Sequence, residues 1–294
     1  MRVEFQYAYV WDLVYHMLEH MKVDNPSDLY AEEYVERIRL EKKEQYPDIV
    51  EAMANLSGYY NENFNRLGII NFLPFGCPDI NALKYVLEQY PGFMPEDREF
   101  FVNPFVELLE KEDAFYGDYW RTLFQHAKEK EFQIEDYLER SLEKYGVLGD
   151  YFHKSTAVVG LSFSMTCAGR GLMGNPDAFV TIIPYSQEEE DYSNLFLQVL
   201  HENTHQFTDA LLQQNICMDD GSHLFSEYIV ILFDYYLIKA ICPEDLESYL
   251  CYLSSALEME EEKMTEELLL NTFVVPEDWS AKLQQLVQDI CLLK

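Results

Sequence analysis

The sequence predicts an α+β protein that is predominantly helical and contains one small sheet. Much of the chain places its apolar residues at the three- and four-residue spacing of amphipathic helices. Two short segments, 157–166 and 178–184, instead have the apolar pattern of β-strands. A helical stretch without Gly or Pro follows them, to about residue 214. We therefore expect a helix packed on a small sheet, together with an N-terminal helical lobe.

The first 150 residues form a mostly helical lobe in this prediction. Residues 3–9 alternate in polarity, as a short strand or the start of a helix would, and 11–21 has helical periodicity. Residues 28–56 are charged and helical, with a break at Pro47. After a loop over 68–78, Pro, Gly and Asp residues delimit four expected helices, near 79–90, 96–111, 114–130 and 134–145. Gly146 and Gly149 make a plausible junction to a second region, 151–294.

The second region begins with the two expected strands. Residues 157–166 alternate as a half-buried strand does, and 168–176 form a turn that lacks the pattern of a phosphate loop. Pro184 suits a strand at an edge or a strand end. We expect the two strands to pair as an antiparallel edge hairpin. Beyond the long helix, a polar turn over 215–221 precedes three more helices, expected over 225–241, 244–271 and 277–292.

The long helix carries the motif H-E-x-x-H as His201, Glu202 and His205. Residues four apart lie on one face of a helix, so both imidazoles can bind one metal ion. Glu202 is rotated by about 100° from His201, which suits contact with a water molecule rather than with the metal. Chance produces such a pattern in roughly two of a hundred chains of this composition. The motif therefore predicts zinc as the cofactor and Glu202 as the general base.

Through this motif the chain resembles the zincin metallopeptidases, over roughly residues 155–241. The metzincin branch needs a Gly and a third His after the motif, where this chain has Thr208 and Leu211. The gluzincin branch takes its third ligand from a Glu on the next helix, and Glu227 matches that position. Many gluzincins have an acidic residue four positions later, but this chain has Ile231, so no family within the branch is indicated.

The resemblance also implies how a substrate would bind. Zincins have a sheet whose antiparallel edge strand lines the cleft and pairs with an extended peptide. Residues 178–183 match that strand, and the region 151–294 would then be catalytic. The substrate is expected to be a peptide or protein.

Five residues after the motif could supply the third metal ligand: Asp219, Asp220, His223, Glu227 and Asp234. The helix runs on for about 14 Å beyond His205 before the chain turns, which puts Asp219 and Asp220 at its far end. His223 starts the return helix, whereas Glu227 lies about one turn further in and has more reach. Asp234 lies two turns after Glu227 on the same face, so it suits either a hydrogen bond to a zinc-bound His or a core position.

A second histidine pair matches the inverse zincin order H-x-x-E-H, as His16, Glu19 and His20. Nothing further along the chain supplies the structural context that this motif needs. We interpret His16 and His20 as ordinary helix residues.

Charge and composition exclude several classes of partner. The chain has 53 acidic and 21 basic side chains, a net charge of −32. Such a surface repels nucleic acid and anionic membranes, so neither is expected as a primary partner. There is no apolar run of 18 residues and no apolar signal core at the N-terminus. The six Cys show no C-x-x-C spacing, so we expect free thiols and a cytoplasmic protein of unknown oligomeric state.

These features predict zinc-dependent hydrolysis of a peptide substrate, with His201, His205 and Glu227 as metal ligands. A donor for the oxyanion is also needed, and the candidates are Tyr228, Tyr235, Tyr236 and His223. One alternative is a zinc-binding regulatory or interaction protein on a zincin scaffold that does not turn over substrate. The other is a helical scaffold without metal.

Overall fold

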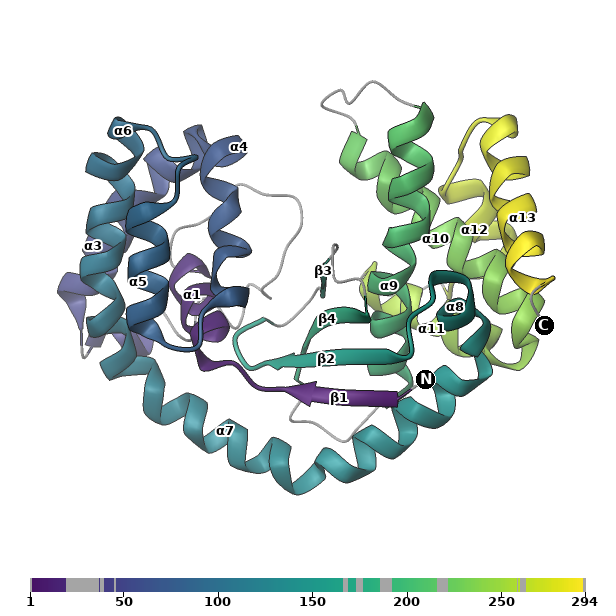
Figure 1. The fold of residues 1–294 in the computed structure, drawn as a ribbon, viewed down its shortest axis with the longest axis horizontal. Helices are drawn as coiled ribbons and strands as arrows, with labels where there is room; N and C mark the ends of the chain where they lie inside the picture. The colour runs from purple at the N-terminus through teal and green to yellow at the C-terminus, as the bar shows by residue number, and fades with distance from the viewer. Residues whose placement is uncertain are drawn as a thin grey trace.

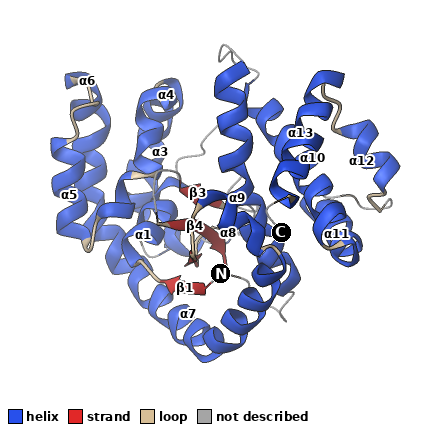
Figure 2. Ribbon diagram, turned by 45° about the vertical axis from the view of Figure 1, so that its right-hand side comes forward, coloured by secondary structure: helices blue, strands red, loops and turns tan. Residues whose placement is uncertain are grey.

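The computed structural model describes residues 2–19, 37, 40–44, 46–165, 169–172, 177–185, 192–215, 222–257, 259 and 263–292. A small four-stranded sheet lies at the centre of the molecule, with helices around it (Figure 1). Figure 2 shows how little of the described chain is strand and how much is helix. The predicted α+β class with a helical majority is confirmed at this level.

The sheet has the strand order β1-β2-β4-β3 and is mixed. The strands β1 Arg2–Gln6, β2 Thr156–Ser162 and β4 Ala178–Pro184 are parallel, and only β3 Arg170–Leu172 is antiparallel to its neighbour β4. The predicted antiparallel pairing of 157–166 with 178–183 is therefore wrong. The segment between β2 and β4 is long enough to return the chain to the start of the sheet, and β3 lies within it. The antiparallel edge pair is β3–β4, in which β4 is interior and β3 is the edge strand.

The strand β2 is buried on both faces, whereas the alternation of its sequence predicted a half-buried strand. Its small and polar positions face a closely packed helix, α1 Tyr9–Glu19, rather than solvent. A Cβ on Gly160 would lie 2.7 Å from the ring of Trp11, and Ser162 donates a hydrogen bond to the Asp12 carboxylate. Alternation of large and small residues thus marks close helix packing here.

One helix, α7 Asn103–Lys144, runs beneath the sheet and connects the N-terminal helices with the C-terminal ones (Figure 1). It covers the predicted helices 114–130 and 134–145 and the second part of 96–111, whose first residues lie in two short helices, Pro95–Asp97 and Arg98–Val102. Gly117 does not break it, because the Tyr9 hydroxyl packs against this position and donates a hydrogen bond of 2.5 Å to Asp113 one turn earlier. A single glycine lowers helix propensity by only about 1 kcal/mol, which such packing offsets.

The helices form two groups, one on each side of the sheet. The first group surrounds the apolar core that includes Leu13, Met53 and Phe105, and consists of α1, α3 Pro47–Glu62, α4 Phe64–Leu67, α5 Ile80–Gln89 and α6 Pro95–Asp97. The second consists of α8 Gly146–Phe152, α9 Tyr192–Asn215, α10 Ser222–Ile241, α11 Leu246–Ala256, α12 Glu266–Thr272 and α13 Glu277–Cys291. The helix predicted over 244–271 is thus two helices, α11 and α12.

The sheet joins the regions expected before and after residue 150. Strand β1 belongs to the first region but pairs with β2 of the second. Val3 and Leu138 also pack in the core of the second group. Within the described chain, no helix has the length and apolarity needed to cross a bilayer.

Candidate metal centre

The helix α9 carries the H-E-x-x-H motif and packs against β3 and β4 on one side and α10 on the other. Asn203 is buried inside the motif and determines where along β4 the motif lies. Thr181 of β4 donates a hydrogen bond of 3.1 Å to Asn203 Oδ1, and Asn203 Nδ2 donates to the Val199 carbonyl at 2.8 Å. The motif is therefore held at one position along β4.

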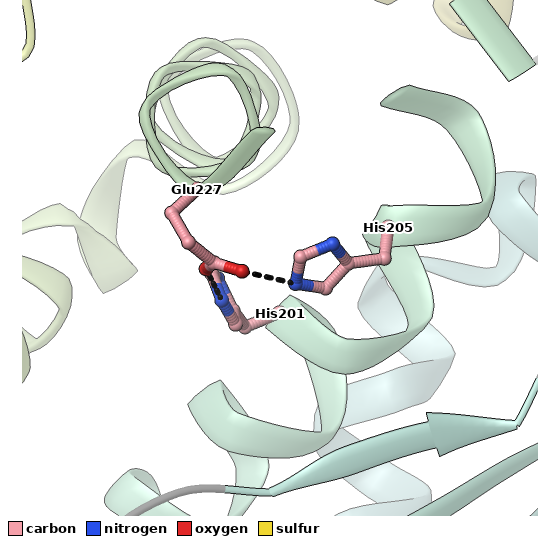
Figure 3. Close-up of side chains that lie close together, drawn as sticks. All are labelled: His201, His205 and Glu227. Carbon is pink, nitrogen blue, oxygen red and sulfur yellow. Dashed lines mark ion pairs between the residues drawn. The ribbon is translucent and has the colours of Figure 1, made fainter. Parts of the chain in front are cut away.

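His201, His205 and Glu227 come together on the side of α9 that faces α10. Glu227 reaches from α10 toward both imidazoles (Figure 3). Its two oxygens lie 3.5 Å from His201 Nε2 and 3.7 Å from His205 Nε2. The side chains are 14%, 17% and 31% exposed for His201, His205 and Glu227, so the cluster is open to a small molecule.

These distances fit a metal ion held between the three groups. They exceed the usual length of a hydrogen bond, about 2.7–3.2 Å. Two ligands at the zinc bond lengths of about 2.0–2.2 Å in a tetrahedral arrangement lie about 3.4 Å apart. Two imidazole nitrogens and one carboxylate are also a donor set that zinc prefers, and three protein ligands with one open position are typical of catalytic rather than structural zinc.

Asp234 lies directly behind His201. Its Oδ2 is 2.8 Å from His201 Nδ1, and Thr204 donates a hydrogen bond of 2.5 Å to its Oδ1. Because Nδ1 is engaged by this carboxylate, Nε2 of His201 is the nitrogen that faces Glu227. Burial opposes protonation of His201, but the hydrogen bond that Asp234 accepts and the nearby Glu227 carboxylate hold its pKa well above the usual value.

Glu202 points away from the three ligand groups, toward strand β3. Its Oε2 accepts a hydrogen bond of 2.7 Å from the Gly171 backbone N–H. Burial raises the pKa of Glu202, and the charges of His201 and Arg170 oppose that rise. The structure thus separates the four motif-related residues into three that converge and one carboxylate beside them.

Two of the three tyrosines predicted as oxyanion donors have hydroxyl groups that hydrogen-bond elsewhere. Tyr235 donates to Glu266 at 2.5 Å, and Tyr236 lies 2.9 Å from the Ser280 hydroxyl. Tyr228 packs edge-on against Phe273. The side chain of His223 lies outside the described residues, as do Asp219 and Asp220.

Tyr252 of α11 is a site residue that the sequence analysis missed. Burial raises its pKa, the carboxylates Glu202, Asp234 and Glu227 raise it further, and the charge of His201 opposes the rise. Within the described chain its hydroxyl makes no hydrogen bond, unlike that of Tyr249, which donates to the Ile231 carbonyl at 2.9 Å. With 22 Tyr in the chain, no local pattern distinguishes this one.

The inverse motif lies in a different core. His16 is buried, with its Nε2 3.0 Å from Glu112 and its ring stacked on Tyr116. Lys42 forms an ion pair with the same Glu112 oxygen. Burial lowers the pKa of His16 to about 4. His20 lies outside the described residues.

Comparisons of this chain with protein-family models, with curated proteins and with solved structures found no match. The function is therefore inferred from the residues and geometry of the site.

Proposed function

We propose that this protein is a zinc-dependent peptidase, in which His201, His205 and Glu227 hold the metal ion. The observation that supports this most directly is the position of Glu227, which faces the Nε2 atoms of both motif histidines from a second helix. The Asp234–His201 hydrogen bond adds the outer carboxylate that zinc-bound histidines usually have. Zinc, when bound, would polarise a substrate carbonyl and lower the pKa of a water molecule.

Glu202 is the general base in this proposal. It follows His201 on α9 but points toward β3, so it lies beside the metal ligands without joining them. A carboxylate there can take a proton from the attacking water and pass it to the leaving amine. We assign the hydrogen bond to the developing oxyanion to Tyr252, because the charges of His201, Glu202 and Glu227 all act on its hydroxyl.

A peptide is the substrate class that the sheet favours. In the described sheet β3 is one of two edge strands, and its Gly171 contacts Glu202. Edge strands bind extended peptides by backbone pairing, which would bring a scissile bond next to the base. The substrate edge expected at 178–183 is displaced to β3, because β4 is interior.

Metal analysis and a peptidase assay test this function together. Elemental analysis should find about one zinc per chain, and a mixed peptide library should be cleaved in a reaction that a chelator abolishes. Glu202→Gln should retain the zinc and lower kcat by about 10² to 10⁴. A protein that binds no zinc after reconstitution would contradict the proposal. Zinc binding without cleavage would favour the non-catalytic, regulatory function instead.

A further inference from the structure

Strand β3 approaches Glu202 closely through the backbone of Gly171. The Gly171 N–H donates a hydrogen bond of 2.7 Å to Glu202 Oε2. A Cβ on Gly171 would lie 2.6 Å from the Glu202 carbonyl oxygen. A Cβ on Gly169 would lie 2.9 Å from Glu202 Cγ and 3.0 Å from Oε1. Both positions therefore require glycine, because the chain can approach α9 so closely only where these two residues have no side chain.

Conformation does not explain these two glycines, since neither has a φ in the left-handed region. Two helical glycines, by contrast, have ample space. A Cβ on Gly58 or Gly146 would meet no atom within 4 Å. The segment 169–171 was interpreted from the sequence as part of a turn. It differs from these helical glycines because Glu202, the predicted general base, occupies the space where a Cβ would lie at both of its glycines.

The contact restricts what the Glu202 carboxylate can do. A hydrogen bond from a backbone N–H to a half-buried carboxylate is among the stronger neutral-donor bonds, because the acceptor is ionised. It fixes Oε2 on the β3 side and leaves Oε1 to receive a proton. Carboxylate oxygens are themselves good zinc ligands, so a Glu202 free to rotate next to His201 could bind the metal in place of water.

We propose that Gly169 and Gly171 are positioning residues, which hold the Glu202 carboxylate as a base and keep it from becoming a fourth metal ligand. The proposal rests on the proposed peptidase function. It assigns to β3 a role in catalysis that is separate from any pairing with substrate.

Substitution of the two glycines tests the role in solution. In Gly171→Ala the new methyl group meets a backbone oxygen, so β3 must move away from α9 and the hydrogen bond is lost. We expect kcat to fall by about 10²-fold with KM within threefold, as for a small misplacement of a reacting group. Zinc affinity should stay equal to that of the wild type or rise.

Gly169→Ala, which places a methyl group against the Glu202 side chain, should show the same pattern. Gly58→Ala is the matched control and should change neither kcat nor zinc affinity. A wild-type kcat in both variants, or a loss of zinc in parallel with kcat, would overturn the proposal.

A double-mutant cycle separates positioning of Glu202 from general damage to the fold. If Gly171 acts through Glu202, Gly171→Ala should lower the residual rate of Glu202→Gln by less than twofold. An equal loss in both backgrounds would show that β3 affects activity by another route.

An experiment without turnover tests the contact itself. Labelling with ¹⁵N-glycine makes only the 12 glycine amides of the chain visible. The Gly171 amide resonance should shift strongly in Glu202→Gln, while the Gly58 and Gly146 resonances should not change. A Gly171 resonance that does not respond would refute the hydrogen bond. These outcomes are separate from failure of the peptidase function, which would appear as absent zinc or absent cleavage in the wild type.

Discussion

His201 has carboxylates at both of its ring nitrogens, and this distinguishes it from an ordinary helix histidine. Nδ1 lies 2.8 Å from Asp234 and Nε2 lies 3.5 Å from Glu227. The shorter contact is a hydrogen bond, and the longer one leaves room for an ion. A metal ligand whose second nitrogen is fixed in this way has one orientation and one available tautomer.

We predict that Asp234→Asn weakens zinc binding by about 10- to 100-fold, because an amide at this position no longer stabilises the orientation and basicity of His201. Competition with a coloured chelator would measure the affinity. Asp245→Asn is the matched control, since Asp245 bonds only with residues outside the site, such as Lys144, and it should leave the affinity unchanged. Equal affinities in all three proteins would mean that Asp234 has only a packing role.

Removal of the Tyr252 hydroxyl tests the predicted oxyanion donor. Tyr252→Phe should lower kcat by about 10²-fold or more and leave zinc bound, as loss of a single donor does in other hydrolases. Tyr236→Phe removes a hydroxyl that lies against Ser280, and its kcat should match the wild type. If Tyr236→Phe were the slower enzyme, the interpretation from sequence would be right and the assignment of Tyr252 wrong.

At the scale of elements, the sequence predicts the positions of site residues best where one helix carries several of them. The spacing of His201 and His205 places both on one face of α9 from helix geometry alone, and the position of Glu227 on the return helix follows from reach. Tyr252 could not be found in this way, because it comes from α11 and is placed by packing between helices. Its distance along the chain from the motif carries no geometric information.

The sheet was harder to predict because pairing depends on contacts between distant segments. Parallel pairing of β2 with β4 on one side and with β1 on the other is set by helices that cover both faces. The segment around Gly169 and Gly171 has the composition of a turn. Its glycines are explained only when α9 lies against them, so the sequence alone indicated a loop where the structure has an edge strand.

Gly160 in β2 gives a test of this packing. A Cβ there would lie 2.7 Å from the Trp11 ring and 2.9 Å from Ile182 Cγ1, both in the core. Gly160→Ala should lower the free energy of unfolding by about 1–3 kcal/mol, the usual cost of overpacking. Gly58→Ala, at an open helical position, should be neutral or slightly stabilising. Urea unfolding of both variants would measure this, and a Gly160→Ala variant as stable as the wild type would contradict the close approach of α1 to the sheet.

At the scale of the whole molecule, Asp12 joins three parts of the fold. Its carboxylate, on α1, accepts hydrogen bonds from the Phe163 backbone N–H just beyond β2 (3.1 Å) and from Trp120 Nε1 on α7 (2.8 Å). Burial raises the pKa of Asp12 to about 6, although the hydrogen bonds from Ser162 and Phe163 oppose the rise. The carboxyl group therefore keeps its proton in the folded protein at a pH where the unfolded chain has lost it.

The titration of Asp12 should be visible in the pH dependence of the free energy of unfolding. The unfolded pKa is 3.8 and the folded value is about 6, so Asp12 favours the folded state fully below the unfolded pKa. This contribution, about 3 kcal/mol, is lost as the pH rises from about 4 to about 6. Mutual repulsion in a chain of net charge −32 also lowers stability over this range, and Asp12→Asn separates the two effects because it leaves the repulsion almost unchanged. Urea unfolding at a series of pH values should show a fall between about pH 4 and 6 that is smaller in Asp12→Asn than in the wild type by about that amount. The same slope in both proteins would mean that the buried carboxylate is ionised in the folded state throughout, stabilised by its hydrogen-bond donors Ser162, Phe163 and Trp120 rather than by a proton.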